Sequence, residues 1–150
     1  MEYTIKKKYT DYPFAHRQHK HDGKCQWCHG HNWTFVIEIG CNELDEQGFV
    51  LDFGKMKFIK NILDTNFDHT LVLSTYDDYV ENFKDLESKN LAKLTLIDND
   101  ASAEGIALWI GNIIDNVVKK DTNNRAYVKS IELFEDSKDS ATVTFNSNNF

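Results

Sequence analysis

Polar and apolar residues alternate most regularly in residues 29–41. One side of this segment carries two histidines followed by large apolar side chains at every second position: His29, His31, Trp33, Phe35, Ile37 and Ile39. Successive side chains of a strand point to opposite faces, so this period predicts a half-buried β-strand. Residues 2–10 alternate more weakly and predict a first strand. Residues 126–135 and 140–146 predict two closing strands, joined by a turn at 136–139.

Two other segments have the period of an amphipathic helix. After a turn at 42–48 and residues 49–53, a helix is expected from Gly54 to about Phe67, with these apolar positions: Met56, Ile59, Ile62, Leu63 and Phe67. A second helix is expected to begin at Ser102, a suitable N-cap, with one apolar stripe: Ile106, Trp109, Ile110, Ile113 and Val117. Between the helices, residues 76–92 predict a polar surface insertion with helical character, and residues 94–97 a short extended run.

The order of these elements is two strands, a helix, an insertion, a helix and two strands. This order predicts an α+β fold in which two helices pack on one face of a four-stranded antiparallel sheet. The other face of such a sheet needs a cover, which favours oligomerisation. The chain has 150 residues and no linker rich in Gly, Pro or Ser, so we expect a single domain over residues 1–150.

The overall charge restricts the class of partner. The chain has 17 Lys and Arg against 24 Asp and Glu, a formal net charge of −7, which argues against a general nucleic-acid or membrane-surface binder. No apolar run approaches the roughly 20 residues of a membrane helix, and residues 1–20 are too polar for a secretory signal. We therefore expect a soluble, cytoplasmic protein.

The average charge hides a basic, histidine-rich first segment. Residues 1–32 hold six of the 17 Lys and Arg residues but only three of the 24 acids. The same segment holds five of the six histidines, which are His16, His19, His21, His29 and His31. A cluster of this kind on an acidic protein suggests a metal ion and an anionic ligand.

The histidines of the second strand have the spacing of metal ligands. His29 and His31 flank Gly30, and at period two both imidazoles point the same way, close enough to share one ion. His16, at the end of the first strand region, is the best candidate for a third ligand. Three neutral imidazoles with an open fourth position describe a catalytic zinc site rather than a structural one. The alternative is that these are hydrogen-bonded surface histidines.

The cysteines are Cys25, Cys28 and Cys41, an odd number that argues against a disulfide framework. The run Cys25-Gln26-Trp27-Cys28-His29 matches the pattern of c-type haem attachment. That attachment normally takes place in an exported, oxidising compartment, and no export signal is present, so we reject it. Half of a structural zinc site is also disfavoured, because the chain has no second C-x-x-C pair.

Six short motifs follow one another along the chain: Phe14-Ala15-His16, Cys25-x-x-x-His29-Gly30-His31-Asn32, Gly48-Phe49-Val50-Leu51-Asp52-Phe53, Asp68-His69, Ala101-Ser102-Ala103-Glu104 and Glu135. From about Tyr12 to Val143 this series resembles the 6-pyruvoyl-tetrahydropterin synthase and 6-carboxy-tetrahydropterin synthase family. Each piece is weak alone, but six in the right order are specific. Three residues separate Cys25 from the His-Gly-His triplet, as in the bacterial carboxy branch, whereas the animal pyruvoyl enzymes have a longer gap.

The resemblance implies roles for particular residues. His16, His29 and His31 would bind zinc, in agreement with the strand argument above. Cys25 matches the catalytic thiol of the family, and Asp68-His69 matches its Asp–His dyad. Glu135 matches the carboxylate that anchors the pterin ring, and Ser102 stands near the pterin pocket where many relatives have Thr. Cys28 stands where relatives often have Leu, so we interpret the C-x-x-C spacing as incidental.

The residues themselves support these roles unevenly. Lys24, the nearby histidines and a zinc ion would favour the thiolate of Cys25. Glu135 shares a strand face with apolar residues, and a carboxylate there needs a specific partner. Asp68 beside His69 has the arrangement of an oriented proton-transfer group, although such pairs are common without function. Ser102 is equally well explained as a helix cap.

The resemblance implies a reaction and an assembly. A carboxy-branch enzyme would use zinc to convert 7,8-dihydroneopterin triphosphate to 6-carboxy-5,6,7,8-tetrahydropterin, acetaldehyde and triphosphate, on the route to 7-deazaguanines such as queuosine. Arg17, Lys20 and Lys24 are candidates to meet the triphosphate. The implied tunnelling fold joins the sheets of three subunits into a barrel, and two trimers stack into a hexamer. Active sites would then lie at subunit contacts, with Asp68 and His69 from a neighbour.

Two alternatives stay open at this point. The first is a 6-pyruvoyl-tetrahydropterin synthase, or a relative that only cleaves the pterin side chain. The second is a non-catalytic zinc- or ligand-binding module on the same fold. The sequence does not decide the product, the end of the pathway or the role of residues 76–92.

Overall fold

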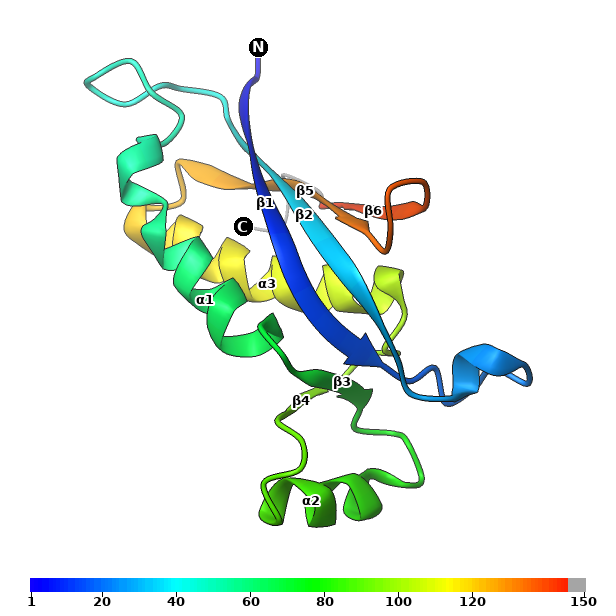
Figure 1. Ribbon diagram of the computed structural model, residues 1–150. Coiled ribbons are helices and arrows are strands. Elements are labelled where there is room, and N and C mark those ends of the chain that lie inside the picture. The colour runs from blue at the N-terminus through cyan, green and yellow to red at the C-terminus, as the bar shows by residue number, and fades with distance from the viewer. Residues whose placement is uncertain (146–150) are drawn as a thin grey trace.

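The histidine-bearing strand lies at the centre of the sheet in the computed structural model, which describes residues 1–145. This strand, β2 (His29–Cys41), pairs antiparallel with β1 (Tyr3–His16) on one side and β5 (Ala126–Phe134) on the other. β6 (Ser140–Thr144) pairs antiparallel with β5 and forms one edge (Figure 1). The four predicted strands are therefore present. Residue 146, which the sequence placed in the last strand, lies outside the described residues.

Two further strands make the sheet mixed. β3 (Leu71–Ser74) runs parallel to the end of β1, and β4 (Leu94–Ile97) runs parallel to β3. The strand order is β4-β3-β1-β2-β5-β6, so the expectation of four antiparallel strands was wrong. β4 coincides with the predicted extended run at 94–97. β3 was missed because four residues show too little periodicity to identify a strand.

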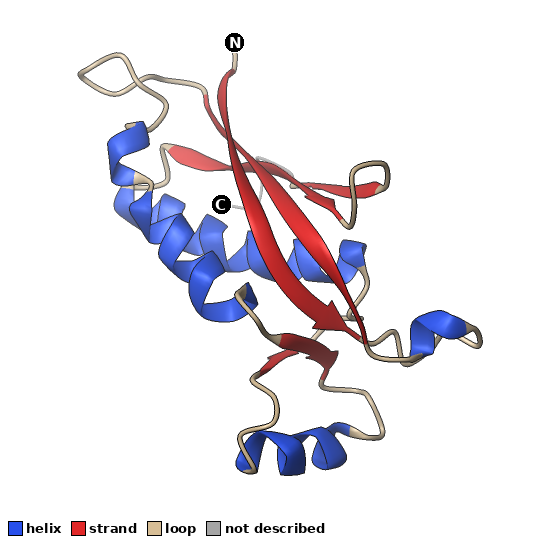
Figure 2. Cartoon of the chain, in the orientation of Figure 1, coloured by secondary structure: helices blue, strands red, loops and turns tan. Residues whose placement is uncertain are grey.

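Both predicted long helices pack on one face of this sheet (Figure 2). A short 3-10 turn, Phe53–Lys55, precedes α1 (Lys57–Phe67), which buries Ile59, Leu63 and Phe67. α3 (Ala103–Asp121) lies against β5 and β6. A third helix, α2 (Val80–Ser88), lies beyond β3 and β4, away from that face, and has no fully buried residue (Figure 1).

The buried face of α3 is rotated relative to the predicted stripe. Its buried residues are Ile106, Ala107, Ile110, Gly111, Ile114 and Val118. Ile113 and Val117, which were expected in the core, are only half-buried. Trp109 turns toward α1, where its ring meets Phe67 edge-on at 6.2 Å. The helix therefore has two adjacent apolar sides, and the periodicity does not identify which of them meets the sheet. Among residues 1–145, no helix has the length and apolar character needed to cross a membrane.

The apolar face of β2 forms the core beside the histidines. Trp33, Phe35, Ile37 and Ile39 are fully buried, and burying each such side chain contributes about 1.5–3 kcal/mol. Phe14 of β1 stacks on Trp33 with 4.4 Å between ring centroids, and Trp33 Nε1 donates to the Phe14 carbonyl at 3.0 Å. This packing fixes the two strands against each other directly beside their histidines.

The opposite face of the sheet is mostly polar around β2, although it also carries Val36 and Phe134. Asn32, Thr34 and Glu38 alternate with the core residues of β2, and Ser130 Oγ donates to Glu38 at 2.9 Å. An uncovered apolar face therefore gives no argument for oligomerisation. An open edge remains, however, because β3 pairs with β1 only at Ala15 and His16. Within residues 1–145, the earlier part of β1 has β2 as its one partner strand.

Gly105 in the first turn of α3 is required by a close approach of the backbone. A Cβ at this position would lie 1.8 Å from the carbonyl oxygen of Asp100. We expect Gly105→Ala to lower the free energy of unfolding by at least about 2 kcal/mol, since the turn before α3 would have to move. Gly30→Ala, whose Cβ would meet only ordinary contact at 3.7 Å, is the control. Urea unfolding of both variants measures this; equal stability would contradict the expectation.

Candidate metal centre

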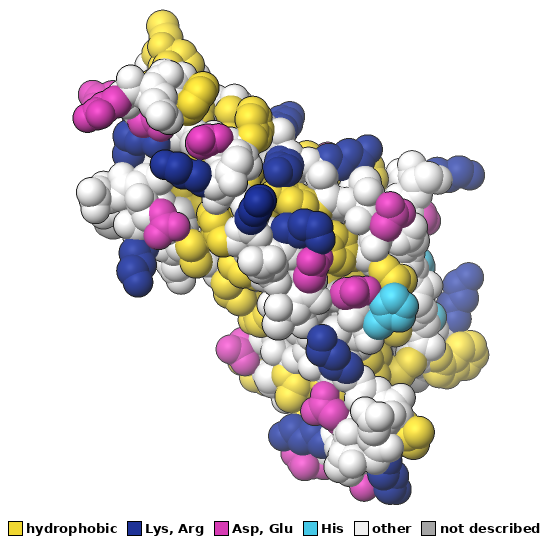
Figure 3. Space-filling model, turned by 60° about the vertical axis from the view of Figure 1, so that its left-hand side comes forward, with side chains coloured by type: hydrophobic (Ala, Val, Ile, Leu, Met, Phe, Trp, Pro, Cys, Tyr) yellow, Lys and Arg dark blue, Asp and Glu magenta, His cyan; other side chains and the backbone are white. Residues whose placement is uncertain are grey.

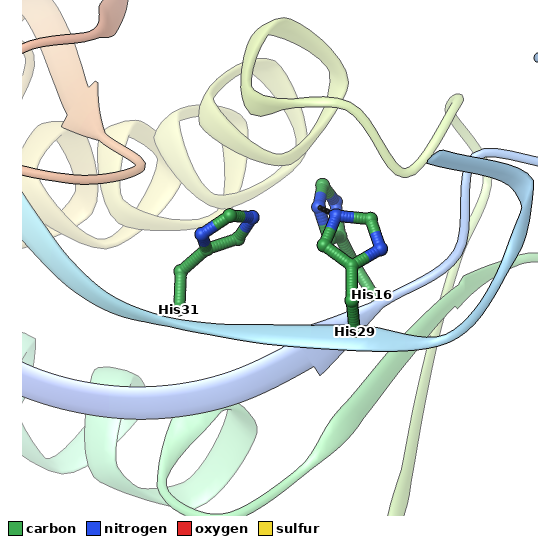
Figure 4. A group of neighbouring side chains, drawn as sticks. All are labelled: His16, His29 and His31. Carbon is green, nitrogen blue, oxygen red and sulfur yellow. Dashed lines mark hydrogen bonds between the residues drawn. The ribbon is translucent and has the colours of Figure 1, made fainter. Parts of the chain in front are cut away.

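Three histidine side chains converge at the end of the two central strands. His16 ends β1 and His29 begins β2, and the antiparallel register places these two residues opposite each other. His31 follows two residues later on the same face. The three rings project to one side of the strands (Figure 4), and one ring nitrogen of each lies within 4.8 Å of the others. The structure therefore brings together the three residues that the sequence proposed as metal ligands.

His16 is oriented by a backbone carbonyl. Its side chain is fully buried, and Nδ1 lies 2.7 Å from the carbonyl oxygen of Ala101, just before α3. Burial, with a smaller contribution from His29 and His31, lowers the pKa of His16 to about 4. The ring is therefore neutral at pH 7. Its Nδ1–H donates to Ala101, which leaves a lone pair on Nε2.

His29 has the same arrangement with a different carbonyl. Its Nδ1 lies 2.7 Å from the carbonyl oxygen of Trp27, so a neutral ring again presents its lone pair at Nε2. The Nε2 atoms of His16 and His29 are 3.0 Å apart. Two lone pairs at this distance repel unless a proton or a cation lies between them. In a tetrahedral zinc site, with metal–nitrogen lengths of about 2.0–2.1 Å, the ligand nitrogens lie about 3.3 Å apart.

His31 supplies an unsatisfied nitrogen. Its Nε2 is buried and, within residues 1–145, has no hydrogen-bond partner. A buried polar atom without a partner is costly, and a metal ion would satisfy it. Three imidazole nitrogens, two of them oriented by carbonyls, fit a divalent zinc-type ion. The residues present therefore suit the metal that the sequence suggested.

Glu135 faces the histidines from the next strand. It directly follows β5, and its Oε1 lies 3.5 Å from His16 Nε2 and 3.6 Å from His31 Nε2. Its backbone N–H donates to Asp139 at 3.0 Å, which fixes the turn that carries it. The family resemblance implies a role for this acid with the substrate; the structure places it beside the three histidines.

Two hollows share Gln18 and Ser102 in their linings, and Glu135 lines one of them. One is lined by Gln18, Ser102, Glu104, Glu135 and Ser140, among others. The other is lined by His19, Lys20, His21, Asp100 and Ser102, among others. Ser102 Oγ accepts from the Gly105 N–H at 3.1 Å, so the residue is the N-cap that the sequence predicted. Its position between the hollows is also compatible with a contact to a ligand.

Cys25 lies in the loop between β1 and β2, on a short 3-10 turn, and is half-buried. Its carbonyl accepts from the Gln18 N–H at 3.1 Å. The cluster of metal-ligating atoms found in residues 1–145 consists of the three histidines and does not include this thiol. Cys28 is exposed and Cys41 is buried in the core, so the C-x-x-C pair does not join the metal centre either.

Asp68 and His69 form a pair on the surface, apart from the histidine cluster. Asp68 Oδ1 lies 2.6 Å from His69 Nδ1, and the side chains are 56% and 81% exposed. His69 has a positive φ of 57° and its N–H donates to the Pro13 carbonyl, so the pair follows α1 beside the open edge of β1. On the side of the molecule that carries α1, basic and acidic side chains are interspersed (Figure 3).

The basic candidates are partly engaged within the protein. Arg17 Nε donates to Asp77 at 2.8 Å, and the Asp77 side chain is 1% exposed. Lys20 pairs with Asp100 at 3.0 Å, and both are largely exposed. The sequence did not predict three of these partners: Asp77 and the carbonyls of Ala101 and Trp27. No pattern identifies them, because a carbonyl belongs to every residue and Asp77 lies far from its partner along the chain.

Comparison with known proteins gives a consistent result. The sequence model of the family described as 6-pyruvoyl tetrahydropterin synthase matches residues 4–146. A Rickettsia typhi protein named 6-carboxy-5,6,7,8-tetrahydropterin synthase is 36% identical over 126 residues, which cover 83% of this chain and 88% of that protein. A Haemophilus influenzae protein of the same name is 27% identical, with 89% of this chain and 92% of that protein covered.

Solved structures show the same fold at lower identity. An uncharacterised protein from Wolinella succinogenes superimposes with a TM-score of 0.81 at 20% identity, covering 97% of this chain and 99% of that one. The 6-pyruvoyltetrahydropterin synthase of Plasmodium vivax gives 0.69 at 20% identity, with 96% and 99% covered. Because the family match spans β1 to β6 and includes all three converging histidines, the chain belongs to the 6-pyruvoyl tetrahydropterin synthase family.

Proposed function

We propose that this chain is a zinc-dependent lyase, a 6-carboxy-5,6,7,8-tetrahydropterin synthase that acts on 7,8-dihydroneopterin triphosphate. The observation that carries the proposal is the convergence of three imidazole Nε2 atoms next to the carboxylate of Glu135. The name shared by the Rickettsia and Haemophilus relatives supports the carboxy reaction over the pyruvoyl one. The products would be 6-carboxytetrahydropterin, acetaldehyde and triphosphate, on the cytoplasmic route to queuosine.

Each candidate residue of the chain would have its own role in the reaction. His16, His29 and His31 would hold the zinc ion, which when bound supplies a Lewis acid for the hydroxyl oxygens of the substrate side chain. Cys25 would exchange a proton with that side chain. Glu135 would accept hydrogen bonds from the amino and ring N–H groups of the pterin, as a charged bidentate acceptor.

His69 would be the second proton carrier. Asp68 holds its Nδ1 at 2.6 Å, which fixes the ring and leaves Nε2 to meet the substrate. The pair is exposed and outside the histidine cluster of its own chain, so the proposal requires a neighbouring subunit to bring it to the site. The open edge of β1, beside this pair, supports an assembly in which sheets join edge to edge. We propose the hexamer of two stacked trimers.

Product analysis tests the proposed reaction. Zinc-loaded protein is incubated with 7,8-dihydroneopterin triphosphate, and the pterins and aldehydes are separated and identified. We expect 6-carboxytetrahydropterin and one equivalent of acetaldehyde. Pyruvoyl-tetrahydropterin without acetaldehyde would make the chain a pyruvoyl enzyme. Binding of zinc and pterin with no turnover would indicate a non-catalytic module on the same fold.

Glu135→Gln should raise KM at least tenfold while zinc content stays at the wild-type level. The amide loses one acceptor and the negative charge, and hydrogen bonds to a charged group contribute about 1.5–3 kcal/mol each. Steady-state kinetics with metal analysis measure both quantities. Glu132→Gln is the matched control, because Glu132 lies on the opposite face of β5, where it bonds Ser140. Loss of zinc at unchanged KM would instead make Glu135 part of the metal centre.

A further inference from the structure

Arg17 connects three separate segments of the chain next to the metal centre. It directly follows His16, so its backbone continues from a proposed metal ligand. Its Nε and Nη2 donate to the two carboxylate oxygens of Asp77, at 2.8 and 3.5 Å, and its Nη1 donates to the carbonyl of Gln26. Gln26 is the residue after Cys25. One guanidinium thus joins the end of β1, the Cys25 turn and the segment that precedes α2.

Asp77 is held rigidly enough to act as an anchor. Its side chain is 1% exposed, and its Oδ1 also accepts from the Tyr79 N–H at 3.0 Å. Its own N–H donates to the Ser74 carbonyl at 3.1 Å, at the end of β3. The Tyr79 ring lies 5.5 Å from the Arg17 guanidinium carbon. The carboxylate is therefore fixed by backbone bonds at the end of β3, while the Tyr79 ring lies against the guanidinium that pairs with it.

The Cys25 turn has few backbone bonds of its own. Within it, Gln26 and Trp27 donate to the carbonyls of Gly23 and Lys24. Among the backbone bonds of residues 1–145, one joins the turn to the residues after β1, from the Gln18 N–H to the Cys25 carbonyl at 3.1 Å. The guanidinium of Arg17 adds a side-chain bond between this turn and the end of β1, beside the bond of the His29 ring to the Trp27 carbonyl at the start of β2. A lysine has no planar fork and cannot make the same set of bonds.

We propose that Arg17 and Asp77 are positioning residues, whose ion pair sets the place of the Cys25 turn relative to the three histidines. This inference rests on the proposed function for its effect on catalysis. It also assigns a role to Asp77, at the start of the segment 76–92 that the sequence predicted as a surface insertion. Removing either partner leaves the other as a poorly solvated unpaired charge, so the turn would loosen from the sheet.

The test compares Asp77→Asn with Glu81→Gln in the zinc-loaded protein without substrate. Both replace an acid by its amide in the same segment, but Glu81 is exposed and pairs with Lys84 on the same helix, α2. Hydrogen exchange, followed by mass spectrometry of residues 17–28, should be at least tenfold faster in Asp77→Asn and unchanged in Glu81→Gln. Arg17→Lys keeps a positive charge but loses the bond to Gln26, so it should also accelerate exchange; it decides the matter if Asp77→Asn does not fold.

Kinetics separate positioning from simple stabilisation. In Asp77→Asn, kcat should fall at least tenfold, while KM stays within threefold and zinc content is unchanged. Unchanged exchange in both Asp77→Asn and Arg17→Lys would overturn the inference, as would faster exchange with unaltered kcat. If the wild type shows no turnover, the proposed function fails, and the exchange experiment alone still supports or overturns the structural tie.

Discussion

Replacing His31 with alanine should leave a folded protein that no longer retains its metal and turns over at least about a thousandfold more slowly. Its Nε2 is buried without a hydrogen-bond partner in residues 1–145, and the nearest carboxylate oxygen, Glu135 Oε1, is 3.6 Å away, so the fold loses no hydrogen bond when the ring is removed. Lewis-acid catalysis by a metal contributes several kcal/mol, and about 4 kcal/mol of barrier corresponds to a thousandfold. We choose His31 rather than His16 for this test. His16 is fully buried and also bonds the Ala101 carbonyl, so its removal would disturb the fold as well as the metal site.

His19→Ala is the control for metal content. It removes an imidazole from the same basic segment, but from a residue outside the converging cluster. Elemental analysis after gel filtration should find about one zinc ion per chain in the control and less than one tenth of that in His31→Ala. Full retention of zinc by His31→Ala would show that the metal is bound elsewhere.

Cys25→Ala should lower kcat by at least about a hundredfold while zinc binding and thermal stability stay close to wild type. Proton transfer by a positioned side chain contributes about 10²–10⁴-fold, and alanine removes the group with little change in volume. Cys28→Ala, three residues further along the same loop, is the matched control and should keep wild-type turnover. Steady-state kinetics of the two variants decide the matter. An unimpaired Cys25→Ala would remove the thiol from the mechanism.

The central strands and the histidine cluster were predictable because their pattern is local. Alternation in β2 places His29 and His31 on one face, and the same alternation continues into the core at Trp33. His16 was proposed as the end of the first strand region, but the strand itself was expected only over residues 2–10, whereas β1 continues to His16. The tautomers of His16 and His29 could not be predicted, since they depend on the carbonyls of Ala101 and Trp27.

Other parts of the fold depend on contacts that no local pattern records. β3 is a strand because it lies parallel between β1 and β4, with four residues and no alternation to reveal it. The rotation of α3 about its own axis depends on which of its two apolar sides meets the sheet. The roles of Cys25 and of the Asp68–His69 pair came from resemblance, and within a single chain neither belongs to the histidine cluster. They therefore stay predictions.

Removal of the metal tests the central claim most directly. Protein treated with a strong chelator is assayed for turnover, circular dichroism and melting temperature, before and after zinc is added back. The core of Trp33, Phe35 and Ile37 is complete without a metal, so we predict loss of turnover, retention of the fold and recovery of activity with about one zinc ion per chain. Unfolding on chelation would mean that the histidines form a structural site. Full activity in the metal-free protein would contradict a catalytic metal altogether.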